Sequence, residues 1–171
     1  MMGLHLRQLR LQVVEPVLRA IGMGGEAAIR LMLGTAAVES RLRYLAQVGG
    51  GPALGIYQME PATARDIVGR YLDQRQDIAS RLSDALAPCA PAPRGWRHMP
   101  DGALCFRLAA DLAFATALAR VRYFWVPEPL PDASDVPAIA RYWKRHFNTL
   151  GGAGTEAKFI DAYREIVSPH L

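Results

Sequence analysis

The carboxyl group of Glu39 is the side chain in this sequence best suited to acid-base chemistry. It follows a stretch, residues 27–38, that is apolar almost throughout. Apolar surroundings favour the neutral form of a carboxyl group and so raise its pKa. A carboxyl that is protonated near neutral pH and can return as a base suits general acid catalysis of glycosidic bond cleavage. The structural alternative is that Glu39 ends a helix or pairs on the surface with Arg41 or Arg43.

A glycine-rich segment, GGGPALG at residues 49–55, follows and could approach a ligand closely. Glycines allow positive φ values and close contact between backbone and ligand. Gln58 offers both a donor and acceptors for sugar hydroxyl or N-acetyl groups, and Tyr44 and Tyr57 offer flat surfaces for sugar rings. The segment lacks the Lys-Ser/Thr ending of a P-loop, which disfavours phosphate binding. A plain flexible loop is the remaining alternative.

A second carboxylate is needed by most glycosidases. The candidates are Glu60, Asp66 and Asp101. Glu60 and Asp66 both stand at the start of an expected helix, where the helix dipole favours a carboxylate for structural reasons. Asp101 lies in an expected loop. Glu60, which follows the Gln58 motif, is the candidate second carboxylate.

The histidines and cysteines do not form a recognisable metal site. The four histidines are scattered without ligand spacing, and no cluster of Cys and His occurs. We therefore expect neither a metal nor another cofactor. Cys89 and Cys105 flank a proline-rich stretch, and either two buried thiols or a disulfide fits their positions.

A helical frame must position these residues. Apolar side chains at helical spacing predict helices over residues 4–21, 26–45, 61–86, 104–124, 135–147 and 155–167. Proline- and glycine-rich connections at 87–103, 126–134 and 149–154 separate the later ones. No alternation typical of strands is sustained. The sequence therefore predicts one mainly α domain over residues 1–171, and a small β-hairpin near residues 45–58 remains open.

Charge and hydropathy limit the partners. The chain has 171 residues, which suits one domain, and a formal net charge of +4. A basic chain favours nucleic acid, an anionic membrane surface or the bacterial cell wall, unless the charge is only a solvated surface. No basic stripe or recognition helix is present, so we do not expect nucleic-acid binding. No apolar run is long enough to span a bilayer. The N-terminal MMGLHLRQLRL lacks the apolar core of a signal peptide, so we expect synthesis in the cytoplasm.

Two regions of the sequence, residues 35–66 and 139–152, resemble the soluble lytic transglycosylases and goose-type lysozymes. The matching motifs, in the family's order and spacing, are Glu39-Ser40, Gly55-Ile-Tyr-Gln58 and Pro61-x-Thr63-Ala64. The resemblance covers residues 35–66 and, more loosely, 139–152, and the whole looks like small phage-encoded members of the group. It implies a lysozyme-like fold with Glu39 as the catalytic acid and base. Ser40 would support the site, and Gly55 and Gln58 would line the cleft.

A further family element, a Tyr-Asn pair, is matched only in part. The nearest equivalent is Phe147-Asn148. The resemblance implies that Asn148 contacts substrate, whereas the family tyrosine is replaced by Phe147. Tyr142, earlier on the same expected helix, or Tyr123 is the candidate for supplying the missing hydroxyl.

The resemblance implies cleavage of peptidoglycan glycan strands between MurNAc and GlcNAc. The favoured reaction is that of a lytic transglycosylase, in which one Glu and the substrate's N-acetyl group produce a 1,6-anhydro sugar. The alternatives are a hydrolysing muramidase of the same fold and a non-catalytic virion or cell-wall-binding protein with a degenerate site. We expect peptidoglycan as the partner and a monomer or a component of a phage particle. The protein would act on the periplasmic cell wall, delivered by a virion or during lysis.

Overall fold

The computed structural model describes residues 3–87, 96–148 and 153–171. Within these ranges the chain is mainly helical and contains no extended strand, which confirms the mainly α prediction. The proline-rich connection predicted at 87–103 lies partly outside the described residues. Cys89 is one of the residues outside them, so the two alternatives for Cys89 and Cys105, a disulfide or two thiols, fall outside them as well.

The N-terminal helix is one rod with a widened turn in its middle. It consists of α1 (Leu6–Leu9), the π turn η1 (Arg10–Val14) and α2 (Glu15–Ala20). Pro16 at the start of α2 has no N–H to donate, so the regular α-helical bonding is interrupted next to the π turn. The helix predicted over residues 4–21 is therefore confirmed.

The helix that carries Glu39 is shorter than the sequence predicts. It is α3 (Glu26–Ser40), most of whose residues are buried, and it ends at Ser40 rather than at residue 45. Arg41 and Leu42 both have positive φ, 50° and 57°, which the α-helix cannot continue through. Ser40 supports this ending, because its Oγ donates to the carbonyl of Ala36 and accepts from the N–H of Leu42.

The helix predicted over residues 61–86 forms, but it is interrupted. Its parts are α4 (Pro61–Asp66), the π turn η2 (Ile67–Tyr71), α5 (Leu72–Gln74) and α6 (Gln76–Leu86). Arg75 separates α5 from α6 with φ −122° and ψ 69°, and its guanidinium binds the carboxylate of Asp77. The helix is therefore broken at Arg75, where the sequence predicted one long helix.

The helix predicted over residues 104–124 is two helices. After the short 3-10 turn η3 (Trp96–His98), α7 (Asp101–Ala110) and α8 (Leu112–Phe124) meet at an angle of 102°. Asp111 forms the corner: its carboxylate accepts from the N–H of Phe114 at 2.9 Å and from Arg107 at 2.9 Å. No single described helix has both the length and the apolar character needed to cross a membrane, although the bent pair α7 and α8 reaches them by length and composition only.

The last two predicted helices are confirmed. They are α9 (Val136–Trp143) with the π turn η4 (Lys144–Asn148), and α10 (Glu156–Ala162) with η5 (Tyr163–Val167) and η6 (Ser168–His170). Each begins at a side-chain cap: Asp135 accepts from the N–H of Ala138, and Thr155 from that of Lys158. Such caps satisfy backbone donors that have no partner inside the helix.

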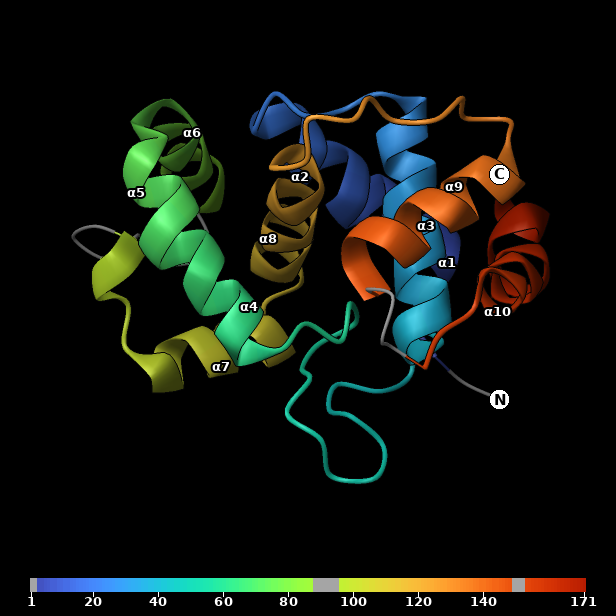
Figure 1. The fold of residues 1–171 in the computed structure, drawn as a ribbon, viewed down its shortest axis with the longest axis horizontal. Helices are drawn as coiled ribbons and strands as arrows, with labels where there is room; N and C mark the ends of the chain where they lie inside the picture. The colour runs from blue at the N-terminus through green and yellow to red at the C-terminus, as the bar shows by residue number, and fades with distance from the viewer. Residues whose placement is uncertain (1–2, 88–95, 149–152) are drawn as a thin grey trace.

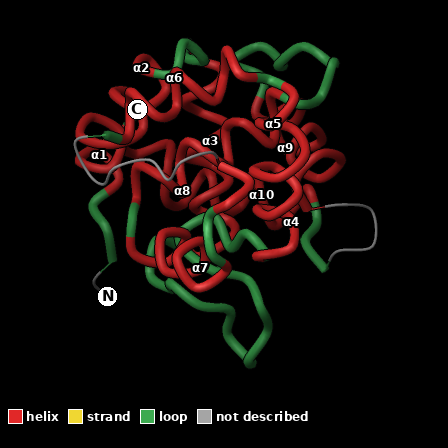
Figure 2. The backbone as a smooth tube through the Cα atoms, turned by 90° about the vertical axis from the view of Figure 1, so that its left-hand side faces the viewer, coloured by secondary structure: helices red, strands yellow, loops and turns green. Residues whose placement is uncertain are grey.

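Figure 1 shows α8 between a group of helices made of α4, α5 and α6 and a second group made of α3, α9 and α10. Turned by 90° in Figure 2, α3 and α8 again lie near the centre of the molecule. The buried apolar side chains form one connected cluster that includes both helices. The segment after Ser40 hangs below the end of α3 before the chain returns to α4 (Figure 1). It thereby connects α3, in one group of helices, with α4, in the other (Figure 1).

The small hairpin left open near residues 45–58 does not form as paired strands. The described residues contain only isolated antiparallel bridges there, Ala46 with Leu54 and Leu54 with Met59. Leu54 and Met59 exchange both backbone hydrogen bonds at 3.0 Å, which closes a tight turn around Gly55. A ladder of paired strands does not form here, because the residues between Leu54 and Met59 are in turn conformation and are not extended.

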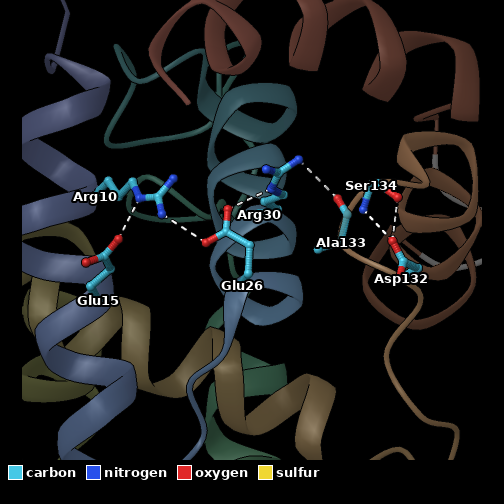
Figure 3. Close-up of polar contacts among 7 residues, drawn as sticks. All are labelled: Arg10, Glu15, Glu26, Arg30, Asp132, Ala133 and Ser134. Atoms are coloured by element: carbon cyan, nitrogen blue, oxygen red, sulfur yellow. Dashed lines mark hydrogen bonds and ion pairs between the residues drawn. The ribbon is translucent and has the colours of Figure 1, made fainter.

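Ion pairs fasten the N-terminal helix to α3, as Figure 3 shows. The guanidinium of Arg10 bridges Glu15 at 2.5 Å and Glu26 at 2.9 Å. Glu26 also accepts from Arg30 at 2.7 Å, and Arg30 reaches the carbonyl of Ala133 at 3.3 Å. This network holds the first turn of α3, at the end of the helix opposite Glu39.

Candidate active site

A cavity of about 540 Å³ opens beside the C-terminal end of α3. Its lining includes Glu39 from α3, Gln58 from the tight turn and Asn148 from the end of η4. These three residues are far apart in the sequence, and all three were predicted as site residues. The cavity is the place where they come together.

Glu39 presents a carboxyl group of unusual basicity to this cavity. Burial raises its pKa from 4.5 to about 7, while a hydrogen bond from Trp143 and the positive charge of Arg122 act in the opposite direction. The indole Nε1–H of Trp143 donates to Oε1 of Glu39 at 3.0 Å. Glu39 also stands at the C-terminal end of α3, where the helix dipole disfavours a negative charge. The carboxyl is therefore balanced between its two forms near neutral pH.

Trp143 is held firmly in the cavity wall. Its side chain is 1% exposed, and its ring packs on that of Phe159 with 5.3 Å between centroids. Gly154 lies directly against it, since a Cβ there would come within 2.5 Å of Cη2 of Trp143 and 2.7 Å of Nδ2 of Asn148. The loop before α10 can therefore close against the indole only because residue 154 has no side chain.

Arg122 of α8 forms hydrogen bonds with the end of η4. Its Nη2 donates to the carbonyl of Phe147 at 2.5 Å and its Nε to that of His146 at 3.3 Å. The guanidinium also lies over the ring of Phe147, with Cζ 4.5 Å from the centroid. These bonds satisfy carbonyl groups at the end of η4, which have no partner within the helix. Arg122 thus fixes the turn that carries Asn148 and places a positive charge near Glu39.

Gln58 and Asn148, two of the three described amide side chains that line the cavity, each make a hydrogen bond with a described residue. Gln58 has φ +44°, and its Nε2 donates to the carbonyl of Gly55 at 2.8 Å. Asn148 accepts from Nζ of Lys144 at 2.9 Å through Oδ1. An amide has more donor and acceptor positions than one bond uses. Both side chains therefore keep hydrogen-bonding capacity for hydroxyl or N-acetyl groups.

Four predicted site residues do not belong to the cavity lining. Ser40 is buried and bonded to backbone groups at the end of α3. Gly55 sits where a Cβ would come within 1.9 Å of the carbonyl oxygen of Leu108, so its role is close packing of the turn on α7. The hydroxyl of Tyr57 is buried against that of Thr116 at 3.1 Å.

Tyr142 is the fourth of these, and its hydroxyl donates to the carbonyl of Glu128 at 3.0 Å. The second candidate for the missing hydroxyl, Tyr123, stacks on Phe147 and bonds Thr35 at 2.8 Å. Neither tyrosine is among the described residues that line the cavity. The bond to the Glu39 carboxyl comes instead from Trp143.

Trp143 and Arg122 are therefore site residues that sequence reasoning missed. Trp143 and Phe147 are four residues apart, which places them on one helix face. Because Phe147 precedes the predicted Asn148, that spacing was a signal that Trp143 faces the same cavity. Nothing in the sequence around Arg122 marked it.

Of the other carboxylates considered, only Glu60 lines the cavity. It is exposed, and the charge of Arg122 lies close enough to interact with both Glu60 and Glu39. Asp66 pairs with Arg70, and Asp101 pairs with Arg65, both away from the cavity lining. Among the described residues, no group of three or more His, Cys, Asp or Glu is arranged to hold a metal ion.

Comparisons of the chain with models of protein families, with curated proteins and with solved structures find no match. The lysozyme-like fold and the transglycosylase family therefore stay predictions from the motifs.

Proposed function

We propose that this protein cleaves the glycan strands of peptidoglycan between MurNAc and GlcNAc, with Glu39 as acid and then base. The observation that carries the proposal is the position of Glu39: a carboxyl with a pKa of about 7, facing a cavity that Gln58 and Asn148 also line. A pKa near the working pH provides both protonation states in useful amounts. The two amides supply the neutral polar contacts that sugars use.

The reaction would proceed with a single protein carboxyl. Glu39 gives its proton to the glycosidic oxygen while the N-acetyl carbonyl oxygen of MurNAc attacks C1 and the leaving strand departs. The Glu39 carboxylate then takes the proton of the C6 hydroxyl, and O6 attacks C1 and opens the oxazolinium ring. The product is a 1,6-anhydro sugar, Glu39 ends protonated as it began, and no water is consumed.

Glu60 is the residue through which hydrolysis would run instead. In that route a second carboxylate activates water against C1. Glu60 lines the same cavity but is exposed, whereas Glu39 is mostly buried and held by Trp143. We favour the single-carboxylate route because only Glu39 has the environment that tunes a carboxyl for proton transfer.

Digestion of purified peptidoglycan by the wild type, Glu39→Gln and Glu60→Gln tests the proposal. Mass spectrometry of the released muropeptides should show anhydro ends for the wild type and Glu60→Gln, and almost no product for Glu39→Gln. Reducing ends that incorporate ¹⁸O from labelled water, and that disappear in Glu60→Gln, would indicate a muramidase. Equal product from Glu39→Gln and the wild type would refute Glu39 as the acid. Co-sedimentation with peptidoglycan without any product would identify a wall-binding protein.

A further inference from the structure

The contact between Trp143 and Glu39 joins the two halves of the cavity wall. Trp143 is the last residue of α9, Glu39 is near the end of α3, and 104 residues separate them. The indole Nε1 and the carboxyl Oε1 are 3.0 Å apart, an ordinary hydrogen-bond length. This bond reaches the group that the proposed reaction uses.

Packing gives the indole one position. Phe159 of α10 lies on one side of the ring, and Gly154 lies close enough that any side chain there would collide with it. Phe159 is itself seated against Gly34 of α3, where a Cβ would come within 2.4 Å of its ring. Because the ring packs on Phe159 of α10, and Phe159 packs on Gly34 of the helix that carries Glu39, the indole cannot rotate away without moving α10.

The chemistry of the indole decides what this fixed contact does. An indole N–H donates only; it neither accepts a proton nor titrates. A tyrosine hydroxyl could donate or accept at the same place. We propose that Trp143 is the positioning residue for Glu39: it holds Oε1 as a constant acceptor and leaves Oε2 as the oxygen that exchanges the proton in the cavity. The proton exchange rests on the proposed function, whereas the holding of Oε1 does not.

Other charged or titratable groups also face the carboxyl and have to be kept apart from this effect. They are Arg122 and Tyr123 of α8, Glu60 before α4 and Lys158 of α10, while Lys144 of η4 bonds the cavity residue Asn148. Arg122 lowers the pKa of Glu39, as the Trp143 hydrogen bond does. A change at Trp143 replaces none of these residues, so a resulting shift reports what the indole contributes, its hydrogen bond and its share of the burial.

The unmodified protein already offers a test that does not depend on cleavage. The chain has three tryptophans, and each gives one indole signal in a ¹H–¹⁵N spectrum. The Trp143 signal should move with pH and share the midpoint of Glu39, about 7. The signal of Trp96, whose Nε1 donates to the carbonyl of Ala79, should not follow this midpoint. In Glu39→Gln the Trp143 titration should vanish; a Trp143 signal that ignores pH in the wild type, or still titrates in Glu39→Gln, overturns the inference.

Trp143→Phe removes the donor and keeps a ring in the wall, with Trp96→Phe as the matched control. The pKa of Glu39, followed by ¹³C signals of its side chain, should rise by about one unit, tenfold in the ionisation constant. The alkaline limit of cleavage should move up with it, which a merely structural loss would not produce. An unchanged midpoint in folded Trp143→Phe contradicts the inference, and if this variant does not fold, the wild-type titration decides.

The two proposals fail in different ways. A protein that cleaves no glycan but shows the linked titration refutes the proposed function and keeps the Trp143–Glu39 relationship. A protein that depends on Glu39 for cleavage but shows no linked titration refutes the positioning role alone.

Discussion

Gly34 and Phe159 meet so closely that a single methyl group would separate them. A Cβ on Gly34 would lie 2.4 Å from Cζ of Phe159 and 3.0 Å from the ring of Tyr163. The helices α3 and α10 therefore contact each other at a glycine, and Phe159 packs on Trp143 as well as on Gly34. The position of the site thus depends on a residue that carries no side chain and lies outside the cavity lining.

Gly34→Ala should destabilise the protein although alanine is the better helix former. Overpacking of a tight core contact costs about 1–3 kcal/mol, more than the roughly 0.5–1 kcal/mol that alanine adds to a helix. Chemical denaturation measures the difference. Gly69→Ala is the control, because no described atom outside its own stretch of helix backbone lies within 4 Å of its would-be Cβ and a small gain is expected there. Equal behaviour of the two variants would mean that α3 and α10 are not in tight contact.

Glu39→Gln should be more stable than the wild type at alkaline pH. The folded pKa of Glu39 is raised above its value in the unfolded chain, so the folded state loses stability as pH rises from about 4.5 to about 7. The shift corresponds to at most about 3 kcal/mol. Glutamine has no charge to bury and escapes this loss. Denaturation at pH 5 and pH 8 should show the variant gaining on the wild type only at the higher pH.

Glu165→Gln provides the opposite sign as a control. Glu165 is exposed, and its hydrogen bond and ion pair with Arg41 lower its pKa. Its contribution is present above the pKa of the unfolded chain and disappears on acidification. Any effect of Glu165→Gln should therefore be a lower stability than the wild type at high pH. The same pH dependence in both variants would show that burial does not govern Glu39.

Arg122→Gln should raise the pKa of Glu39 further, since the positive charge of Arg122 lowers it. Arg122→Lys keeps the charge but loses the planar fork that reaches two carbonyl groups. The ¹³C titration of Glu39 should therefore shift upward in the glutamine variant and much less in the lysine variant. Both should lose roughly 1–3 kcal/mol of stability, because carbonyls at the end of η4 lose their partner. An identical midpoint in the wild type and Arg122→Gln would contradict the electrostatic role.

Tyr57→Phe should affect stability and not cleavage. The hydroxyl of Tyr57 bonds Thr116 in the buried core, and the ring is 1% exposed. Removing it costs about 1–2 kcal/mol, because the buried Thr116 hydroxyl loses its partner. Thermal unfolding and initial cleavage rates of the purified variant measure both effects. A raised KM at unchanged stability would show that Tyr57 contacts substrate after all.

Most of the helices could be predicted from the sequence, because apolar side chains that recur about every 3.6 residues indicate the buried face of a helix. The interruptions at Arg75 and Asp111 could not be predicted from the sequence. Whether a single residue departs from helical φ and ψ depends on the groups that pack around it in the folded chain. Asp111 shows this well: its carboxylate caps α8 and also binds Arg107, a choice that the sequence alone does not reveal.

The site was predicted unevenly for a related reason. Glu39, Gln58 and Asn148 came from short motifs and do line one cavity. Ser40 and Tyr57 belong to the same motifs, but each is a chain neighbour that points elsewhere, into the core. A motif gives the order of residues, whereas the direction of each side chain depends on the turn that carries it. Trp143 was missed because its partner is distant in the sequence.

The π turn η4 determines where Asn148 lies relative to Trp143. A π turn accommodates one more residue than the α-helix at the same place, and such turns are frequent at functional sites. Here it runs over Lys144–Asn148 and ends on a cavity residue. Taking out one residue from it would leave a regular helix and turn everything that follows by about 100° around the axis. Asn148 would then turn out of the cavity while Trp143 stayed, so the π turn is what places both residues in the same wall.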